Sequence, residues 1–278
     1  MGNCVYRFHK THHSLEKDTA HSREDAKLPD SVILHVQGDG HDDLDSDTVW
    51  EKRLPENYQQ ILTKMVSPAN FSSKKQIYNS LCESFLIENG TKRIWLDKST
   101  GKIGCMLSAK ALDITWGNDT RYWRWVSRDD SKFEQVAELV LVWWFEVWRR
   151  IECTLLSPNT QYIVSFVVKI DKTEVPSYPS PFVFSLKTPN GDLIESARFL
   201  DDLEKPVEKH GGLKMTPVTY GENGWIEFVV GEFSLEDDED NDDTKDIDVS
   251  MKNTSSCIKS GIFIDGVKIV PKKLSANE

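Results

Sequence analysis

Three tryptophans stand close together within residues 112–125, beside side chains that can form hydrogen bonds. Apolar and polar residues alternate up to Trp116, which predicts a strand, and residues 117–119 (Gly-Asn-Asp) then supply a turn. An indole is large, rigid and carries an N–H group, so it is often left at a binding surface. Its flat face suits the apolar face of a sugar ring, while neighbouring Asp, Asn and Arg suit the hydroxyls. The pattern predicts a sugar-binding surface. The alternative is that the indoles fill a sandwich core, with at least one of Trp116 and Trp125 pointing inward.

The stretch 112–125 (LDITWGNDTRYWRW) resembles the signature of the plant phloem protein 2 family, the Nictaba-like lectins. Further blocks agree with that family in the same order. They are residues 105–110, 136–139, 144–147, 156–162, 224–227, 231–233 and 259–262. The resemblance extends over residues 93–272, and the part upstream of it is similar to the F-box subgroup of the family.

This resemblance implies a jelly-roll β-sandwich that binds N-acetylglucosamine oligomers or the core of N-linked glycans. It implies that Trp116 and Trp123 are the aromatic residues that stack on the sugar. Two glutamates are expected to form hydrogen bonds to the sugar, and their positions fall here on Asp246 and on Lys252 or Asn253. The loss of such an acceptor costs about 1–3 kcal/mol, which is about ten- to a hundredfold in affinity.

Two further positions depart from the pattern of the family. Ile258 stands where relatives usually have Trp, and Trp148-Arg149 replaces the usual Arg-Gly. Sugar binding that is weakened or directed to another glycan therefore stays open. The alternative function is a protein-interaction scaffold, or a degenerate F-box-type receptor that recruits substrates to a ubiquitin ligase.

The composition excludes some classes of function. The chain has 278 residues, a formal net charge of −11 and a pI of about 5.2, which argues against broad nucleic-acid binding because phosphates require a basic surface. Five scattered cysteines without a CxxC motif indicate free thiols in a reducing compartment. With no apolar stretch long enough to span a bilayer and no secretory signal, we expect the protein in the cytoplasm or nucleus.

The N-terminal 46 residues are polar and rich in histidine, and we expect a disordered tail without a metal site. Gly2 and Cys4 could carry acyl chains, and nearby basic residues would strengthen such an anchor. Tyr6 occupies the position where the myristoylation pattern has Ser or Thr. Association with a membrane is expected only if this end is lipidated.

Residues 47–92 resemble the end of an F-box and the linker that follows it. The upstream helical core that grips the ubiquitin-ligase adaptor is not recognisable, which argues against adaptor binding. Ile77, Leu81 and Phe85 recur every four residues, so a short helix is predicted over residues 74–86.

From residue 93 to residue 272 the pattern is all-β, and residues 273–278 form a short tail. Short strands separated by turn signals indicate a sandwich or barrel. The predicted strands are residues 93–96, 104–107, 111–116, 122–126, 136–147, 161–170, 182–186, 224–230, 246–251 and 262–269. The acidic run at 236–243 is interpreted as a solvated loop; a calcium site is the alternative.

No signature of an enzyme is present, and neither a catalytic residue nor a cofactor is predicted. Glu146 and Glu152 could be read as a glycosidase pair, but strand-surface glutamates are common. Binding is the better interpretation. Single lectin sites are weak, so a homodimer would be one way to gain avidity.

Overall fold

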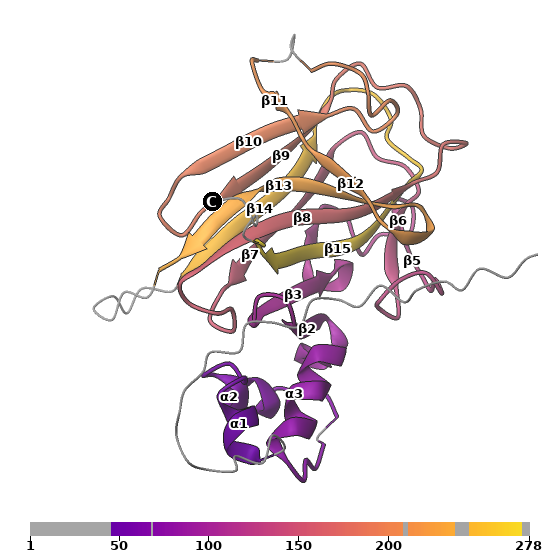
Figure 1. Ribbon diagram of the computed structural model, residues 1–278. Helices are drawn as coiled ribbons and strands as arrows, with labels where there is room; N and C mark the ends of the chain where they lie inside the picture. The colour runs from indigo at the N-terminus through magenta and orange to yellow at the C-terminus, as the bar shows by residue number, and fades with distance from the viewer. Residues whose placement is uncertain (1–45, 68, 208–210, 237–244, 274–278) are drawn as a thin grey trace, which may run out of the picture. The chain divides into compact units, whose positions relative to one another are not determined.

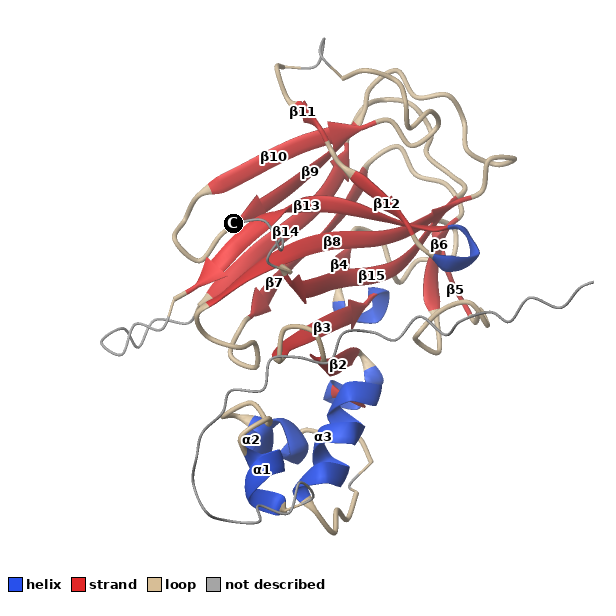
Figure 2. Cartoon of the chain, viewed as in Figure 1, coloured by secondary structure: helices blue, strands red, loops and turns tan. Residues whose placement is uncertain are grey.

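The computed structural model describes residues 46–67, 69–207, 211–236 and 245–273, all of which lie in one compact unit. The predicted tail with Gly2 and Cys4 lies outside the described residues, as does most of the acidic run. Figure 2 shows that helices are confined to the first part of this unit, apart from short turns, and that strands make up the remainder.

Three helices precede the sheets: α1 (Asp47–Glu51), α2 (Tyr58–Thr63) and α3 (Lys74–Glu83). Ser73 is the N-cap of α3, and its side chain accepts a hydrogen bond from the Gln76 backbone N–H. Ile77 and Leu81 form its buried face. The predicted helix is confirmed over residues 74–83 but is wrong beyond them, because Ser84 adopts a φ of 76° and strand β1 follows.

Among the described residues, nine strands form one sheet and six form a second (Figure 1). Apart from the parallel β10–β11 pair, neighbouring strands are antiparallel. The order in the larger sheet is β1 (Phe85–Ile87), β2 (Lys92–Asp97), β3 (Lys102–Ser108), β15 (Ile262–Pro271), β8 (Thr160–Ile170), β13 (Trp225–Leu235) and β12 (Val218–Tyr220), with β6 (Val136–Leu139) beside β15 and β5 (Trp123–Val126) beside β6. The order in the smaller sheet is β11 (Lys214–Met215), β10 (Leu193–Arg198), β9 (Phe182–Lys187), β14 (Asp246–Asn253), β7 (Phe145–Glu152) and β4 (Asp113–Ile114).

The core lies between the two sheets and is filled by the apolar side of each alternating strand. Phe184 of the smaller sheet stacks on Phe228 of the larger, with ring centroids 5.2 Å apart, and lies 6.2 Å from Phe166. All three rings are fully buried. The predicted all-β sandwich is confirmed.

Some strand boundaries differ from the prediction. The strand expected over 111–116 is reduced to the two residues of β4, because the chain turns at Trp116. The apolar run 136–147 was predicted as one strand but forms two. They are β6, which belongs to the larger sheet, and the first part of β7, which belongs to the smaller. Strands β1, β10, β11 and β12 were not predicted. β10 is as long as β9, but the apolar Leu193 is exposed, so apolar residues do not mark its buried face.

Gly266 allows β15 to lie close to its antiparallel neighbour β3. The register between β15 and β8 shifts between Ile264 and Gly266. At the same point β15 stops pairing with β6 and begins to pair with β3. A Cβ atom at residue 266 would lie 1.7 Å from the carbonyl oxygen of Leu107. Because the obstacle is backbone, it cannot rotate away.

We predict that Gly266→Ala lowers the free energy of unfolding by about 1–3 kcal/mol or more, as overpacked substitutions do. Urea unfolding followed by circular dichroism measures this change. Ser234→Ala on the exposed side of β13 is the control and should change stability by less than about 0.5 kcal/mol. Equal stability of the two variants would contradict the close approach.

Candidate functional site

The turn between β4 and β5 is held by two indole side chains. The Trp123 Nε1–H donates to the carbonyl oxygen of Thr115 at 3.1 Å, and the Trp125 Nε1–H donates to that of Gly117 at 3.2 Å. Between these two anchored carbonyls, Trp116 adopts a φ of 58°, which is rare for a bulky side chain. The two hydrogen bonds therefore fix the backbone on either side of Trp116.

Trp123 is part of the core and not of a surface. Only 2% of it is exposed, and its ring lies 5.9 Å from that of Phe145. Strand β5 pairs with β6 so that Trp123 stands opposite the buried Leu139. The expectation that Trp123 offers an open face to a sugar is wrong, because the sheet directs its side chain inward; its role is to support the turn.

Trp116 is the indole of this stretch that faces solvent, with 49% of it exposed. Its ring packs against that of Tyr122, with centroids 5.3 Å apart, and the Arg121 guanidinium lies over the Tyr122 ring. Arg121 is held in turn by a forked ion pair with Asp119, with a closest distance of 2.6 Å. An apolar plate thus stands beside fixed polar groups.

Asp246 and Asn253 do not meet in one site. They occupy the first and last positions of β14, which puts them about 23 Å apart. The Asp246 carboxylate pairs with Arg150 at 2.9 Å, and the buried Asn253 donates to the carbonyl oxygen of Ser180 at 3.0 Å. The prediction that both contribute to a site with Trp116 is wrong. β14 is extended, and Asp246 and Asn253 lie at its opposite ends, seven positions apart.

Two exposed tryptophans on β7 and directly before it were missed by the sequence reasoning. Trp144 and Trp148 are 48% and 45% exposed. The Trp144 Nε1–H donates to Glu146 Oε2 at 3.1 Å, and Glu146 Oε1 pairs with Lys252 Nζ at 2.9 Å. The signal was the alternation of residues 144–148, in which buried Phe145 and Val147 separate the three outward side chains.

These side chains adjoin the turn of Trp116 through the backbone. Asp113 of β4 pairs with Trp148, and the Thr115 N–H donates to the Glu146 carbonyl oxygen at 3.1 Å. We define the tryptophan surface as Trp116, Trp144, Glu146, Trp148 and Lys252. Glu146, Trp148 and Lys252 lie on the outer side of β7 and β14. Trp144 directly precedes β7, and Trp116 stands in the turn that follows β4.

The charge of Glu146 is stabilised by its neighbours. The hydrogen bond with Lys252 and the one from Trp144 hold the pKa of Glu146 below its ordinary value of 4.5. Glu146 is therefore an ionised acceptor at neutral pH. It lies about 20 Å from Glu152 on the same strand, which is more than the about 5–9.5 Å that separates the carboxylates of a glycosidase pair.

Metal and thiol chemistry have little support in the described ranges. Within them no group of three or more His, Cys, Asp or Glu side chains is arranged to hold a metal ion. Burial raises the pKa of Cys105 to about 11 and raises that of Cys153 as well, so both thiols are protonated at neutral pH. The structure also contains no helix, among the residues it describes, with the length and apolar character needed to cross a membrane.

Comparison with known proteins identifies the family. Residues 102–271 match the family described as Phloem protein 2. The chain belongs to the phloem protein 2 family. The F-box protein PP2-B15 of Arabidopsis thaliana is 34% identical over 88% of this chain and 89% of its own length. The F-box protein VBF of the same plant is 32% identical over 82% of this chain and 87% of its own length.

Among solved structures, the CBM22-1 xylan-binding domain from Paenibacillus barcinonensis Xyn10C is similar to 66% of this chain and 94% of that chain. Its sequence identity is 12% and its TM-score is 0.30. At this level of similarity, the site of this phloem protein 2 chain has to be interpreted from its own residues.

We predict that two tryptophans of this phloem protein 2 domain differ in how much they contribute to stability. Trp123→Phe should lower the free energy of unfolding by about 1–3 kcal/mol, because the Thr115 carbonyl loses its donor and the core loses volume. Trp116→Ala should cost less than about 1 kcal/mol, since an exposed ring loses only its contact with Tyr122. Urea unfolding of both variants measures the difference. The reverse order would show that Trp116, and not Trp123, supports the turn.

Proposed function

We propose that this protein is a lectin that binds neutral oligosaccharides on the tryptophan surface, with N-acetylglucosamine oligomers or the core of N-linked glycans as ligands. The observation that carries the proposal is the exposure of Trp116, Trp144 and Trp148 along one sheet edge. Large apolar side chains left in water together commonly mark an interaction site. Membership of the phloem protein 2 family supports the same interpretation.

The rigidity of the surface favours recognition of a flat ligand. The Trp116 backbone is fixed by the turn, and the Trp144 indole is oriented by its hydrogen bond to Glu146. A sugar that stacks on an already ordered ring does not have to immobilise that side chain on binding. The apolar face of a pyranose lies on the indole, and its hydroxyls reach the polar groups beside it.

Of the residues that the resemblance indicated, Lys252 lies on the tryptophan surface, and Glu146 supplies the carboxylate there in place of Asp246. A carboxylate accepts hydrogen bonds from sugar hydroxyls, and an ammonium group donates to a ring oxygen, a hydroxyl or an acetamido carbonyl. Glu146 accepts a hydrogen bond from Trp144 and pairs with Lys252, whereas Asp246 lies at the other end of β14 and the Asn253 side chain is buried. Hydrogen bonds that involve a charged group are the stronger ones.

The first experiment uses Trp116→Ala in the full chain. Retention on immobilised chitin oligomers and on a glycan array should fall by about tenfold or more, which corresponds to about 1.4 kcal/mol of lost stacking. Leu193→Ala is a matched control, since Leu193 is an exposed apolar residue on β10. Unchanged retention of the Trp116 variant would remove this indole from the site.

The dependence on pH tests Glu146. Because the pKa of Glu146 lies below 4.5 in the folded chain, the carboxylate keeps its charge on acidification until the pH falls below that value. Sugar affinity should therefore be constant from neutral pH to about pH 5 and decrease only below it. Glu146→Gln should bind more weakly at neutral pH and show no such decrease, with folding monitored by circular dichroism. A wild-type transition above pH 5 would contradict this role.

The proposal is for binding without catalysis, in the cytoplasm or the nucleus. The residues that would confer a membrane location, Gly2 and Cys4, stay a prediction that intact-mass measurement of protein from plant cells would check. A homodimer is proposed only as a means to present more than one copy of the tryptophan surface. Sedimentation with and without a glycan would decide it.

A second candidate function is a protein-interaction scaffold or substrate receptor of a ubiquitin ligase. It is favoured by relatives named as F-box proteins that match 88% and 82% of this chain. In this case sugar binding would be weakened or absent, the folded domain would recruit proteins, and the N-terminal segment would hold the adaptor. Co-purification of the adaptor with the full chain, and its loss on deletion of residues 1–90, would support this function; no co-purification would exclude it.

A further inference from the structure

A pocket lies on the outer face of the nine-stranded sheet, away from the tryptophan surface. It has a volume of about 690 Å³, which is within the range of about 300–1,000 Å³ of small-molecule sites. Its walls come from the end of α3, the loop of residues 129–132, and the turn η3 (Glu222–Gly224). Its floor is formed by strand residues such as Trp95, Met106 and Val167.

The indole of Trp95 lies flat on the floor of this pocket. Trp95 of β2 is paired with Gly104 of β3. A Cβ atom built on Gly104 would be 2.7 Å from Trp95 Cε2 and 2.9 Å from its Nε1. The ring therefore occupies the space directly over the glycine. Because Trp95 is only partly buried, one face of its ring packs on the sheet and the other is directed toward the pocket.

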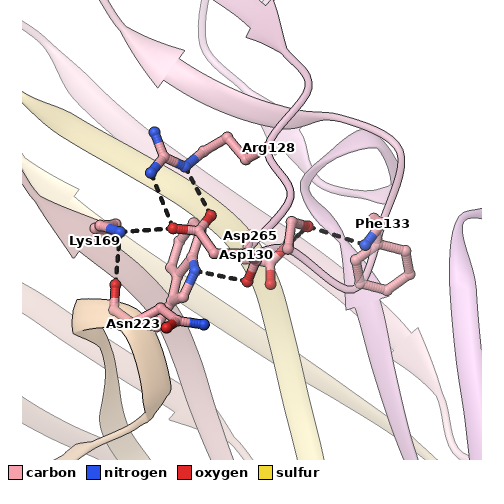
Figure 3. Close-up of polar contacts among 8 residues, drawn as sticks. Arg128, Asp130, Phe133, Lys169, Asn223 and Asp265 are labelled. Carbon is pink, nitrogen blue, oxygen red and sulfur yellow. Dashed lines mark hydrogen bonds and ion pairs between the residues drawn. The ribbon is translucent and has the colours of Figure 1, made fainter.

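The wall beside Trp95 is locked in place by a charged network (Figure 3). Asp130 accepts hydrogen bonds from Arg128 and from Lys169, at 2.9 and 2.7 Å. Lys169 also donates to the carbonyl oxygen of Asn223 at 2.6 Å, which joins this loop to η3. The two cations hold the pKa of Asp130 well below its usual value, so this wall is fixed before any ligand arrives.

A second set of contacts places acceptors at the pocket. The Trp225 Nε1–H donates to the Asp130 carbonyl oxygen at 3.0 Å, and Ser131 Oγ donates to Asp265 Oδ1 at 2.7 Å. Asp265 is almost wholly buried, and desolvation raises its pKa. Glu227 pairs with Lys268 at 2.6 Å. Figure 3 shows Asp265 on the sheet beneath the loop that carries Asp130.

The charge of the pocket limits the class of ligand. Among the described residues that line it, three are basic and six are acidic, namely Glu83, Asp129, Asp130, Glu222, Glu227 and Asp265. Phosphates and other anions are disfavoured, because they would lie against an excess of carboxylates. Carboxylates accept hydrogen bonds from hydroxyl groups, and an indole plate packs on an apolar ring face. A neutral sugar satisfies both requirements.

We propose that this pocket is a second carbohydrate site, in which one pyranose ring of a neutral oligosaccharide stacks on Trp95 and its hydroxyls donate to Glu227 and to its acidic neighbours. The site lies on a different sheet from the tryptophan surface and shares no residue with it. One chain would then hold two glycans at once, and cross-linking would not require a homodimer.

The test follows the indole N–H signals of the full-length, 15N-labelled chain by NMR, with Trp95 and Trp116 assigned from their single Phe variants. Cellotriose and triacetylchitotriose are added to millimolar concentration. The Trp95 signal should shift in the wild type and equally in Trp116→Ala. In Trp95→Ala, the remaining signals of the pocket, such as that of Trp225, should no longer respond. Leu193→Ala changes an exposed residue of β10 outside both sites; it is the control and should leave the shift of Trp95 unchanged.

The outcomes separate the two sites. A response of Trp116 without one of Trp95 would overturn the second site and leave the first; a response of Trp95 alone would do the opposite. A shift caused by cadaverine but by neither trisaccharide would show that the pocket takes amines and would also overturn the proposal. If Trp95→Ala does not fold, the isosteric Glu227→Gln replaces it, with an expected rise of about tenfold in Kd at Trp95. An unchanged Kd would count against the proposal.

Discussion

Two indole N–H groups fix the turn that exposes Trp116. Bonded to the Thr115 and Gly117 carbonyls, they hold a turn in which Trp116 takes a left-handed conformation. That conformation costs about 1–2 kcal/mol in a bulky residue, and two neutral hydrogen bonds return about 1–3 kcal/mol. The balance is close, so the burial of Trp123 in the core makes the turn stable. An exposed tryptophan therefore depends on a buried one.

Each sheet exposes a tryptophan on its outer face, and the structural reason differs between the two sheets. On β7 the simple alternation of the strand turns Trp148 outward while Val147 packs in the core. On β2 a large ring is laid flat because its partner across the strand pair is Gly104. The first arrangement gives an open edge and the second gives the floor of a pocket. Both present an indole face whose position is set by backbone pairing, which is what a weakly binding ligand requires.

The fold and part of the candidate site could be predicted from the sequence, and each wrong prediction has a physical reason. The β-sandwich followed from short alternating strands. The burial of Trp123 was also readable, since Trp123 lies opposite in alternation to the exposed Arg124, but the resemblance assigned it to the sugar. The exposure of Trp116 was not readable, because alternation with Ile114 directs it inward and only a positive φ reverses that direction. The pocket at Trp95 joins seven separate segments, and no local sequence pattern predicts that they come together.

The alternation of β14 also decides which side chain can replace the second glutamate expected from the resemblance. Asp246 and Asn253 are seven residues apart, so a period of two puts them on opposite faces, whereas Lys252 shares the outer face with Asp246. Lys252 already pairs with Glu146, so that acceptor is partly satisfied and an ammonium donor stands beside it. Such a pair is better suited to a sugar that offers an acceptor, such as an acetamido carbonyl, than to one that offers hydroxyls alone. The exchange of an expected acid for Lys252 thus puts an ammonium donor, and not a second carboxylate, beside Glu146.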